Sequence, residues 1–144
     1  MILPDVNVLV HAFRRESASH ERCAGWLSRV VAGSDELALH DLVLGGVVRI
    51  VTNPRIFADP APTAAAREFL SRVRAARRGR WLSSGPAVWH EFDQLAEGDP
   101  GVRGDVVPDA FLAALALAHG ARLATADRGF ARFPGLDRFD PVRG

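Results

Sequence analysis

The stretch PDAFLAALALAHGARLATAD, residues 108–127, decides the fold class that we expect for this chain. It begins with a proline, which is favoured in the first turn of a helix, and continues as a strongly apolar helix to His119. Gly120 predicts the end of that helix, and residues 122–124 predict a short buried strand. A strand that follows a helix at once, with Asp127 just beyond it, is typical of an α/β sheet.

The same alternation of short strands and helices extends over the rest of the sequence. Further strands are expected at residues 2–3, 36–39, 81–83 and 136–139. Further helices are expected at residues 6–13, 19–31, 41–52, 63–78, 86–97 and 127–133. We therefore predict an α/β fold with a parallel sheet flanked by helices on both faces, in one domain spanning residues 1–144.

The composition limits the class and the compartment. With 48% apolar and 24% charged residues in 144, the chain is predicted to be globular rather than disordered. No apolar run approaches the length of a membrane span, and the N-terminus has an acid and no basic stretch, so no membrane partner or signal peptide is expected. The single cysteine, Cys23, excludes an intramolecular disulfide and a cysteine-based zinc site, so we expect the reducing cytoplasm.

The basic residues exclude several mechanisms. All 18 are arginine, and the chain contains neither lysine nor tyrosine. P-loop ATPases, Schiff-base enzymes, haloacid-dehalogenase phosphatases and receiver domains all need a lysine, and tyrosine recombinases need a tyrosine. A GC-rich genome explains the missing lysine, but the exclusion holds whatever its cause.

Three aspartates stand where strands end or a helix begins. Asp5 follows the first strand, Asp109 lies in the first turn of the apolar helix, and Asp127 follows the strand at 122–124. Ligands of open α/β sheets bind at the carboxyl ends of the strands, and clustered oxygen ligands without cysteine or histidine favour Mg²⁺ or Mn²⁺. As an alternative, each acid stabilises the start of a helix by capping it or by interacting with its dipole.

Four segments resemble a known family: PDVNVLVHAF around Asp5, RIVTNPRIF at residues 49–57, VVPDAFLAALALAHG at 106–120 and LATADRGFARFPGL at 123–136. Together they are similar to the PIN-domain ribonucleases, and most of all to the VapC toxins of bacterial type II toxin–antitoxin systems. The resemblance covers nearly the whole chain.

The resemblance implies a five-stranded parallel sheet and a Mg²⁺-dependent endoribonuclease, a hydrolase of RNA phosphodiester bonds. It also implies a small cognate antitoxin and a homodimer. The metal ligands and catalytic residues implied are Asp5, Asp109 and Asp127. Thr125 matches a residue that supports the metal-bound water network, and Asn7 matches a frequent neighbour of the site.

The chain departs from the family at one ligand position. A glutamate usually stands three residues before the arginine that aligns with Arg49, and here that position is Gly46. We therefore expect weak metal binding, with more water ligands on the ion. Asp41 lies on the same segment, five residues earlier, and helical rotation is expected to turn it elsewhere unless a loop carries it inward. Asp41 and the additional acid Asp105 are alternatively helix caps.

Other residues and functions remain open at this point. Arg49 and Arg55 are the expected RNA-phosphate contacts, whereas the cluster from Arg67 to Arg80 is either a solvated helix face or a second phosphate-binding surface. His40 precedes Asp41 and either approaches the cleft or has a structural or solvent-facing role, and the latter is expected. Two other functions remain: a catalytically weakened domain that binds RNA or protein, and a magnesium phosphohydrolase of small molecules.

Overall fold

The computed structural model describes residues 1–143, and its centre is a parallel five-stranded sheet. The strands lie in the order β3-β2-β1-β4-β5, and every neighbouring pair is parallel. Their bounds are β1 (Ile2–Pro4), β2 (Leu37–Leu39), β3 (Gly79–Trp81), β4 (Arg122–Ala124) and β5 (Arg138–Phe139). The predicted α/β class and the five parallel strands are confirmed.

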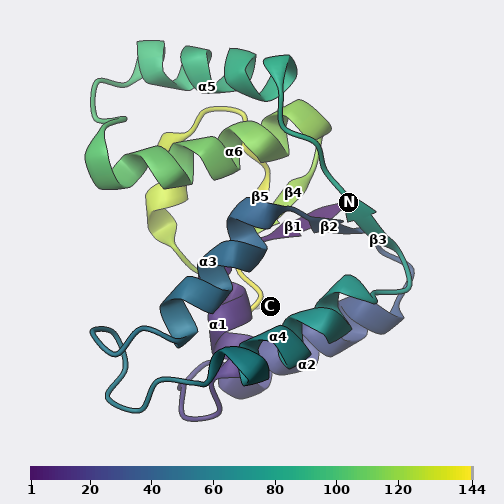
Figure 1. Cartoon of the computed structure of the whole chain (residues 1–144). Helices are drawn as coiled ribbons and strands as arrows, with labels where there is room; N and C mark the ends of the chain where they lie inside the picture. The colour runs from purple at the N-terminus through teal and green to yellow at the C-terminus, as the bar shows by residue number, and fades with distance from the viewer. Residues whose placement is uncertain (144) are drawn as a thin grey trace.

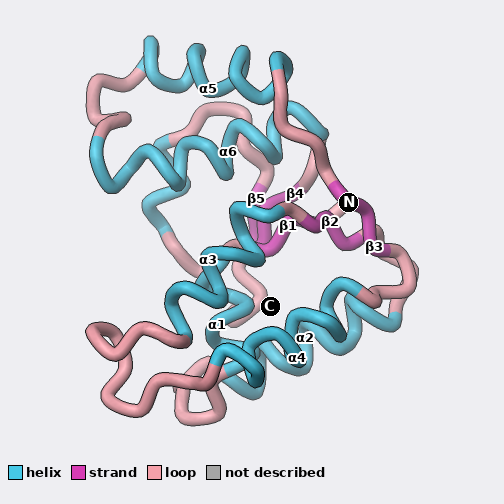
Figure 2. The backbone as a smooth tube through the Cα atoms, in the orientation of Figure 1, coloured by secondary structure: helices cyan, strands magenta, loops and turns pink. Residues whose placement is uncertain are grey.

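Six α-helices surround the sheet (Figures 1 and 2). They are α1 (Val6–Phe13), α2 (His20–Ala32), α3 (Asp41–Val51), α4 (Thr63–Arg74), α5 (Pro86–Gly98) and α6 (Val107–His119). Two short 3₁₀ helices, η1 (Gly104–Val106) and η2 (Arg128–Arg132), precede α6 and follow β4. Figure 1 shows α5 and α6 on one side of the sheet and α2 and α4 on the other, as parallel crossover connections require.

The core lies between these layers and explains why the strands are short apolar runs. Leu3, Leu37, Leu39 and Leu123 of the three inner strands are fully or almost fully buried. The apolar face of α6, which includes Leu115, packs against this sheet. Gly120 closes α6 in the left-handed conformation, with φ of +64°, as its sequence position predicted.

Three predicted elements differ from the structure by two or more residues. The third strand is Gly79–Trp81 rather than 81–83, because Leu37 pairs with Gly79 and Leu39 with Trp81. Helix α4 ends at Arg74 rather than 78, because the backbone N–H of Arg77 donates to the Val31 carbonyl instead of continuing the helix. The fifth strand has only two residues, Arg138–Phe139.

The parallel sheet brings the carboxyl ends of all five strands to one edge. Asp5 follows β1 and the segment from Thr125 to Asp127 follows β4, and these two strands are direct neighbours. No helix within residues 1–143 has the length and apolar character needed to cross a membrane.

Candidate metal centre

Asp5 is a buried carboxylate held at the end of β1. Its backbone N–H donates to the Ala124 carbonyl at 2.9 Å, which continues the pairing with β4, and only 5% of the residue is exposed. Thr125, also buried, donates its hydroxyl to Asp5 Oδ2 at 2.7 Å. Burial raises the pKa of Asp5, the Thr125 hydrogen bond partly offsets this, and the Asp127 charge raises the pKa further. Asp5 occupies the N-cap position of α1, as the capping alternative requires, but its side chain makes no capping hydrogen bond there.

Asp109 lies in the first turn of α6, directly after Pro108, and shares a cavity with Asp5. Partial burial raises the pKa of Asp109 to about 6, and the charges of Asp5 and Asp127 contribute to that rise. The structure thus places Asp109 within electrostatic reach of both other predicted acids. The helix dipole favours a carboxylate at this position, but it does not compensate for burial and for two like charges.

Asp127 serves as the N-cap of η2. Its Oδ1 accepts a hydrogen bond from the Gly129 backbone N–H at 2.8 Å, and its own backbone N–H donates to Thr125 Oγ1 at 3.0 Å. The capping role considered for this residue is therefore confirmed. Capping engages one carboxylate oxygen, and Thr125 connects Asp127 to Asp5 through a single hydroxyl.

The cavity between α1, α3 and α6 has a volume of about 500 Å³. Its wall contains Asp5 and Asp109, the predicted supporting residues Asn7 and Asp41, and the predicted RNA contact Arg49. Gly46, the position of the missing ligand, also lines it. Arg55, in the turn after α3, and Asp105, in η1, are exposed and do not line the cavity.

Asp41 begins α3 and is exposed, and the N-cap of that helix is His40 rather than Asp41. The alternative role of Asp41 as a helix cap was therefore wrong. Asp41 lines the same cavity as Gly46, and that cavity extends along α3 from Asp41 to Ile50. The expectation that helical rotation turns Asp41 away from the other acids stays a prediction.

Gly46 is packed closely rather than open. A Cβ placed there would lie 3.0 Å from Val6 Cγ2, whereas a Cβ at the neighbouring Gly45 would meet nothing within 4 Å. Gly46 therefore allows a close approach of α1 to α3, which explains why a glycine occupies this position in the helix.

The donor set fits a hard divalent cation with an incomplete protein shell. Asp5 and Asp109 line one cavity, and burial and a neighbouring acid raise the pKa of each. A bound cation would offset both the burial of the negative charges and their mutual repulsion. Within residues 1–143, no three His, Cys, Asp or Glu side chains gather as a complete ligand group. Mg²⁺ tolerates such a site, because it usually keeps several waters and takes one or two carboxylates.

His40 stabilises the scaffold beside this cavity. Its Nδ1 accepts the Leu42 backbone N–H at 3.0 Å, so Nε2 carries the proton and donates to Ser84 Oγ at 2.8 Å. Burial lowers the pKa of His40, as this neutral pattern requires. The predicted structural role is confirmed.

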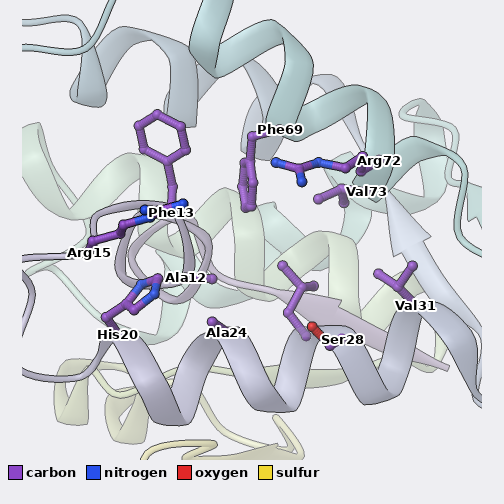
Figure 3. Close-up of a pocket in the computed structure, with 11 residues that line it drawn as sticks. Ala12, Phe13, Arg15, His20, Ala24, Ser28, Val31, Phe69, Arg72 and Val73 are labelled. Atoms are coloured by element: carbon purple, nitrogen blue, oxygen red, sulfur yellow. The ribbon is translucent and has the colours of Figure 1, made fainter.

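A different hollow, of about 520 Å³, lies between α1, α2 and α4 (Figure 3). Its side chains include Phe13 and Phe69 with the cationic Arg15 and Arg72, and none of its lining residues is acidic. It adjoins the carboxyl end of α1, whereas Asp5 precedes the amino end. This hollow does not have the chemistry of a hydrolytic metal site.

A third hollow was missed by sequence reasoning. It has a volume of about 350 Å³ and adjoins Thr125 and Asp127 on the side away from α3. Its lining includes Arg128, Arg138 and Arg143. Position just after a strand, the rule that selected Asp5 and Asp127, would have found Arg128 and Arg143 but not Arg138, which begins β5.

The sheet order, the acids after β1 and β4 and the acid in α6 define a class of α/β domain with a candidate metal site at its carboxyl edge. Residues 2–136 match the PIN domain family, and the chain belongs to that family. Ribonuclease VapC43 of Mycobacterium tuberculosis is 40% identical over 144 residues, covering 100% of this chain and 97% of that protein. Ribonuclease VapC25 of the same species is 35% identical over 141 residues, covering 98% and 99%.

A solved structure shows the same fold. VapBC2 from Rickettsia felis, bound to a DNA fragment from its promoter, superposes with a TM-score of 0.68 at 19% identity, covering 97% of this chain and 98% of that one. The predicted resemblance to PIN-domain VapC ribonucleases is thereby confirmed.

Proposed function

We propose that the protein is a Mg²⁺-dependent endoribonuclease toxin of the VapC type, with Mn²⁺ as an alternative ion. One observation carries this proposal: Asp5 and Asp109 enter one cavity from two elements, with Asp127 close enough to raise the pKa of both. The names of the relatives, VapC ribonucleases over the full length of the chain, support it.

Each acid has a distinct part in the proposed site. Asp5 and Asp109 hold the cation, and Asp127 adds charge from the far side of Thr125. The ion, when bound, neutralises charge on the phosphoryl oxygens and activates water. Thr125 fixes the orientation of Asp5 through its hydroxyl.

The proposed binding residues lie on the α3 side of the cavity. Arg49 and Asn7 line it and are exposed, so both can meet an RNA strand without losing an internal partner. Arg55 lies in the turn after α3 and is also exposed. Asp41 is a further proposed ligand, and Asp105 lies outside the cavity.

Cleavage of RNA by the purified chain tests the proposal. We expect cleavage of structured RNA with Mg²⁺ or Mn²⁺, none in EDTA, and a loss of at least about 100-fold in Asp5→Asn and Asp109→Asn, because each change removes a ligand charge. Arg29→Ala, an exposed site on α2, is the matched control. Undiminished cleavage by folded Asp5→Asn protein would exclude the proposed site.

The replacement at Gly46 favours a second candidate, a catalytically weakened PIN domain that binds RNA or protein. Gly46 lines the acid cavity and supplies no oxygen. RNA binding without metal-dependent cleavage would identify this function. Hydrolysis of small phosphate esters in place of RNA would identify the phosphohydrolase alternative.

We also propose a small antitoxin partner, a homodimer and action in the cytoplasm on RNA. The acids in the cavity favour an arginine from the antitoxin, and the structural neighbour from Rickettsia felis is a VapBC assembly. Co-expression with the product of a small adjacent gene should give a stable complex that suppresses cleavage. A chain that remains monomeric at high concentration and binds no such product would contradict both partner proposals.

A further inference from the structure

The hollow beyond Asp127 joins the acid site through a shared side chain. Thr125, which hydrogen-bonds to Asp5, also lines this hollow, as does Asp127. The cavity with Arg49 lies on the α3 side of Asp5, and this hollow lies at the carboxyl ends of β4 and β5. Asp5 and Asp109 line the first cavity and Asp127 lines the second, and the Thr125 hydroxyl links Asp5 to Asp127.

Three arginines give this hollow its charge. Arg128 begins η2, Arg138 begins β5 and Arg143 lies in the C-terminal turn, and all three are exposed. Asp140, the other acid of the lining besides Asp127, accepts the Val142 backbone N–H at 2.8 Å and pairs with Arg143 at 3.5 Å. Three arginines therefore share this lining with two carboxylates, and each carboxylate already accepts a backbone N–H, from Gly129 at Asp127 and from Val142 at Asp140.

The arginines next to this hollow in the C-terminal segment are paired. Arg122 pairs with Asp137, and Arg132 pairs with Asp99. Within residues 1–143, Arg128 and Arg138 have no salt bridge and no side-chain hydrogen bond. In the C-terminal segment, the arginines without a partner are therefore the two that line this hollow.

We propose that the hollow lined by Arg128, Arg138 and Arg143 binds a backbone phosphate of the RNA strand, next to the phosphate held at the acids. A strand that crosses from Arg49 past Asp5 and Asp127 meets carboxylates at its centre, and cationic groups on both sides offset their repulsion of the flanking phosphates. Guanidinium groups suit this task because they bind phosphate oxygens in a bidentate manner. This inference rests on the proposed ribonuclease function.

RNA binding without cleavage tests the subsite. The affinity of the full chain for a fluorescently labelled single-stranded RNA is measured by anisotropy in EDTA over a series of salt concentrations. We expect the Arg128→Ala/Arg138→Ala double variant to bind roughly tenfold more weakly, with a log–log salt slope shallower by about 0.7, the value for one lost phosphate contact on a single strand. Its affinity for Mn²⁺, measured by calorimetry, should stay within about twofold of the wild type, because neither residue is a ligand.

A matched control removes the same charge elsewhere. Arg15, after α1, and Arg29, on α2, are exposed and have no salt bridge within residues 1–143, so Arg15→Ala/Arg29→Ala should leave both the affinity and the slope nearly unchanged. An equal loss in both double variants would show a general charge effect and overturn the subsite.

If the wild type cleaves RNA but Arg128→Ala/Arg138→Ala binds it as the wild type does, the subsite is wrong and the ribonuclease stands. If the wild type binds RNA through these arginines and does not cleave it, the proposed function fails instead.

Discussion

The hydroxyl of Thr125 donates to Asp5 Oδ2 at 2.7 Å and accepts the backbone N–H of Asp127 at 3.0 Å. One buried side chain therefore sets the position of an acid from β1 and of the segment that carries the acid after β4. Because a hydroxyl can donate and accept at once, the pair of bonds needs both the oxygen and its proton. Thr125 is thus a positioning residue for the candidate metal centre.

Thr125→Val removes both bonds at nearly constant shape. The Thr125 hydrogen bond lowers the pKa of Asp5, so its loss should raise that pKa further and weaken Mn²⁺ binding by roughly 10–100-fold, as for other supports of ligands. Thr125→Ser keeps the hydroxyl and should bind Mn²⁺ nearly as the wild type does. Titration calorimetry on both variants measures this, and equal affinity in Thr125→Val and wild type would show that the bond has no influence on the site.

The raised pKa of Asp109 should make the stability of the metal-free chain depend on pH. Its folded pKa of about 6 exceeds the unfolded value of 3.8, so the stabilising contribution is complete below 3.8 and is lost as pH rises through about 6. Asp109→Asn cannot ionise and should lack this loss. Urea unfolding in EDTA, from roughly pH 4 to 7.5, should show wild type weakening relative to Asp109→Asn as pH rises. A constant difference between the two proteins would contradict the raised pKa.

The affinity for metal should increase as Asp109 loses its proton. Protons and the cation compete for Asp109, so the affinity for Mn²⁺ should rise steeply up to roughly pH 6–7 and then level off. His40 does not account for this profile as a metal ligand, because both of its ring nitrogens already bond to Leu42 and Ser84. Calorimetric titrations at several pH values test it, and an affinity independent of pH in this range would rule out a ligand with so high a pKa.

Strand ends and helix starts could be predicted from the sequence because local signals specify them. Gly120 after the apolar helix and the acids after the short apolar runs led to β1, β4 and the Asp5–Asp109 cavity. The capping of η2 by Asp127 was foreseen as an alternative for the same reason. These features depend on a few neighbouring residues.

Features set by distant contacts could not be predicted. The register of β3 follows from pairing with β2, and α4 stops where Arg77 bonds to Val31, which lies far away in sequence. The packing of Val6 at Gly46 and the extent of the cavity along α3 also depend on how helices meet. Sequence spacing gives the direction of a side chain on its own helix but not the shape of the space it faces.

A second contact between distant segments gives a prediction about stability. Asp99, just after α5, accepts Arg132 Nε of η2 at 2.9 Å and the Gly101 backbone N–H at 2.8 Å. A Cβ at Gly101 would overlap Arg132 Nη2 and crowd Asp99 Oδ1, so Gly101→Ala should displace Arg132 from Asp99 and lower the melting temperature. Gly98→Ala, where a Cβ meets nothing within 4 Å, is the matched control and should be neutral or stabilising. Thermal unfolding compares them, and equal melting temperatures would show that Arg132 moves aside freely.

The last prediction concerns the missing ligand at Gly46. Gly46→Glu places a carboxylate in the cavity of Asp5 and Asp109 and should tighten Mn²⁺ binding by roughly tenfold or more, equivalent to about 1.4 kcal/mol. Gly46→Gln is the matched control, since it has nearly the same shape and helix propensity without the charge. The new Cβ would lie 3.0 Å from Val6 Cγ2, so Val6→Ala is combined with both variants to provide room. If the folded Gly46→Glu/Val6→Ala protein binds Mn²⁺ no more tightly than Gly46→Gln/Val6→Ala, no ligand is missing at this position. Asp41→Asn completes the series, because Asp41 lines the same cavity: loss of Mn²⁺ binding there would show that the fourth acid has moved to the start of α3.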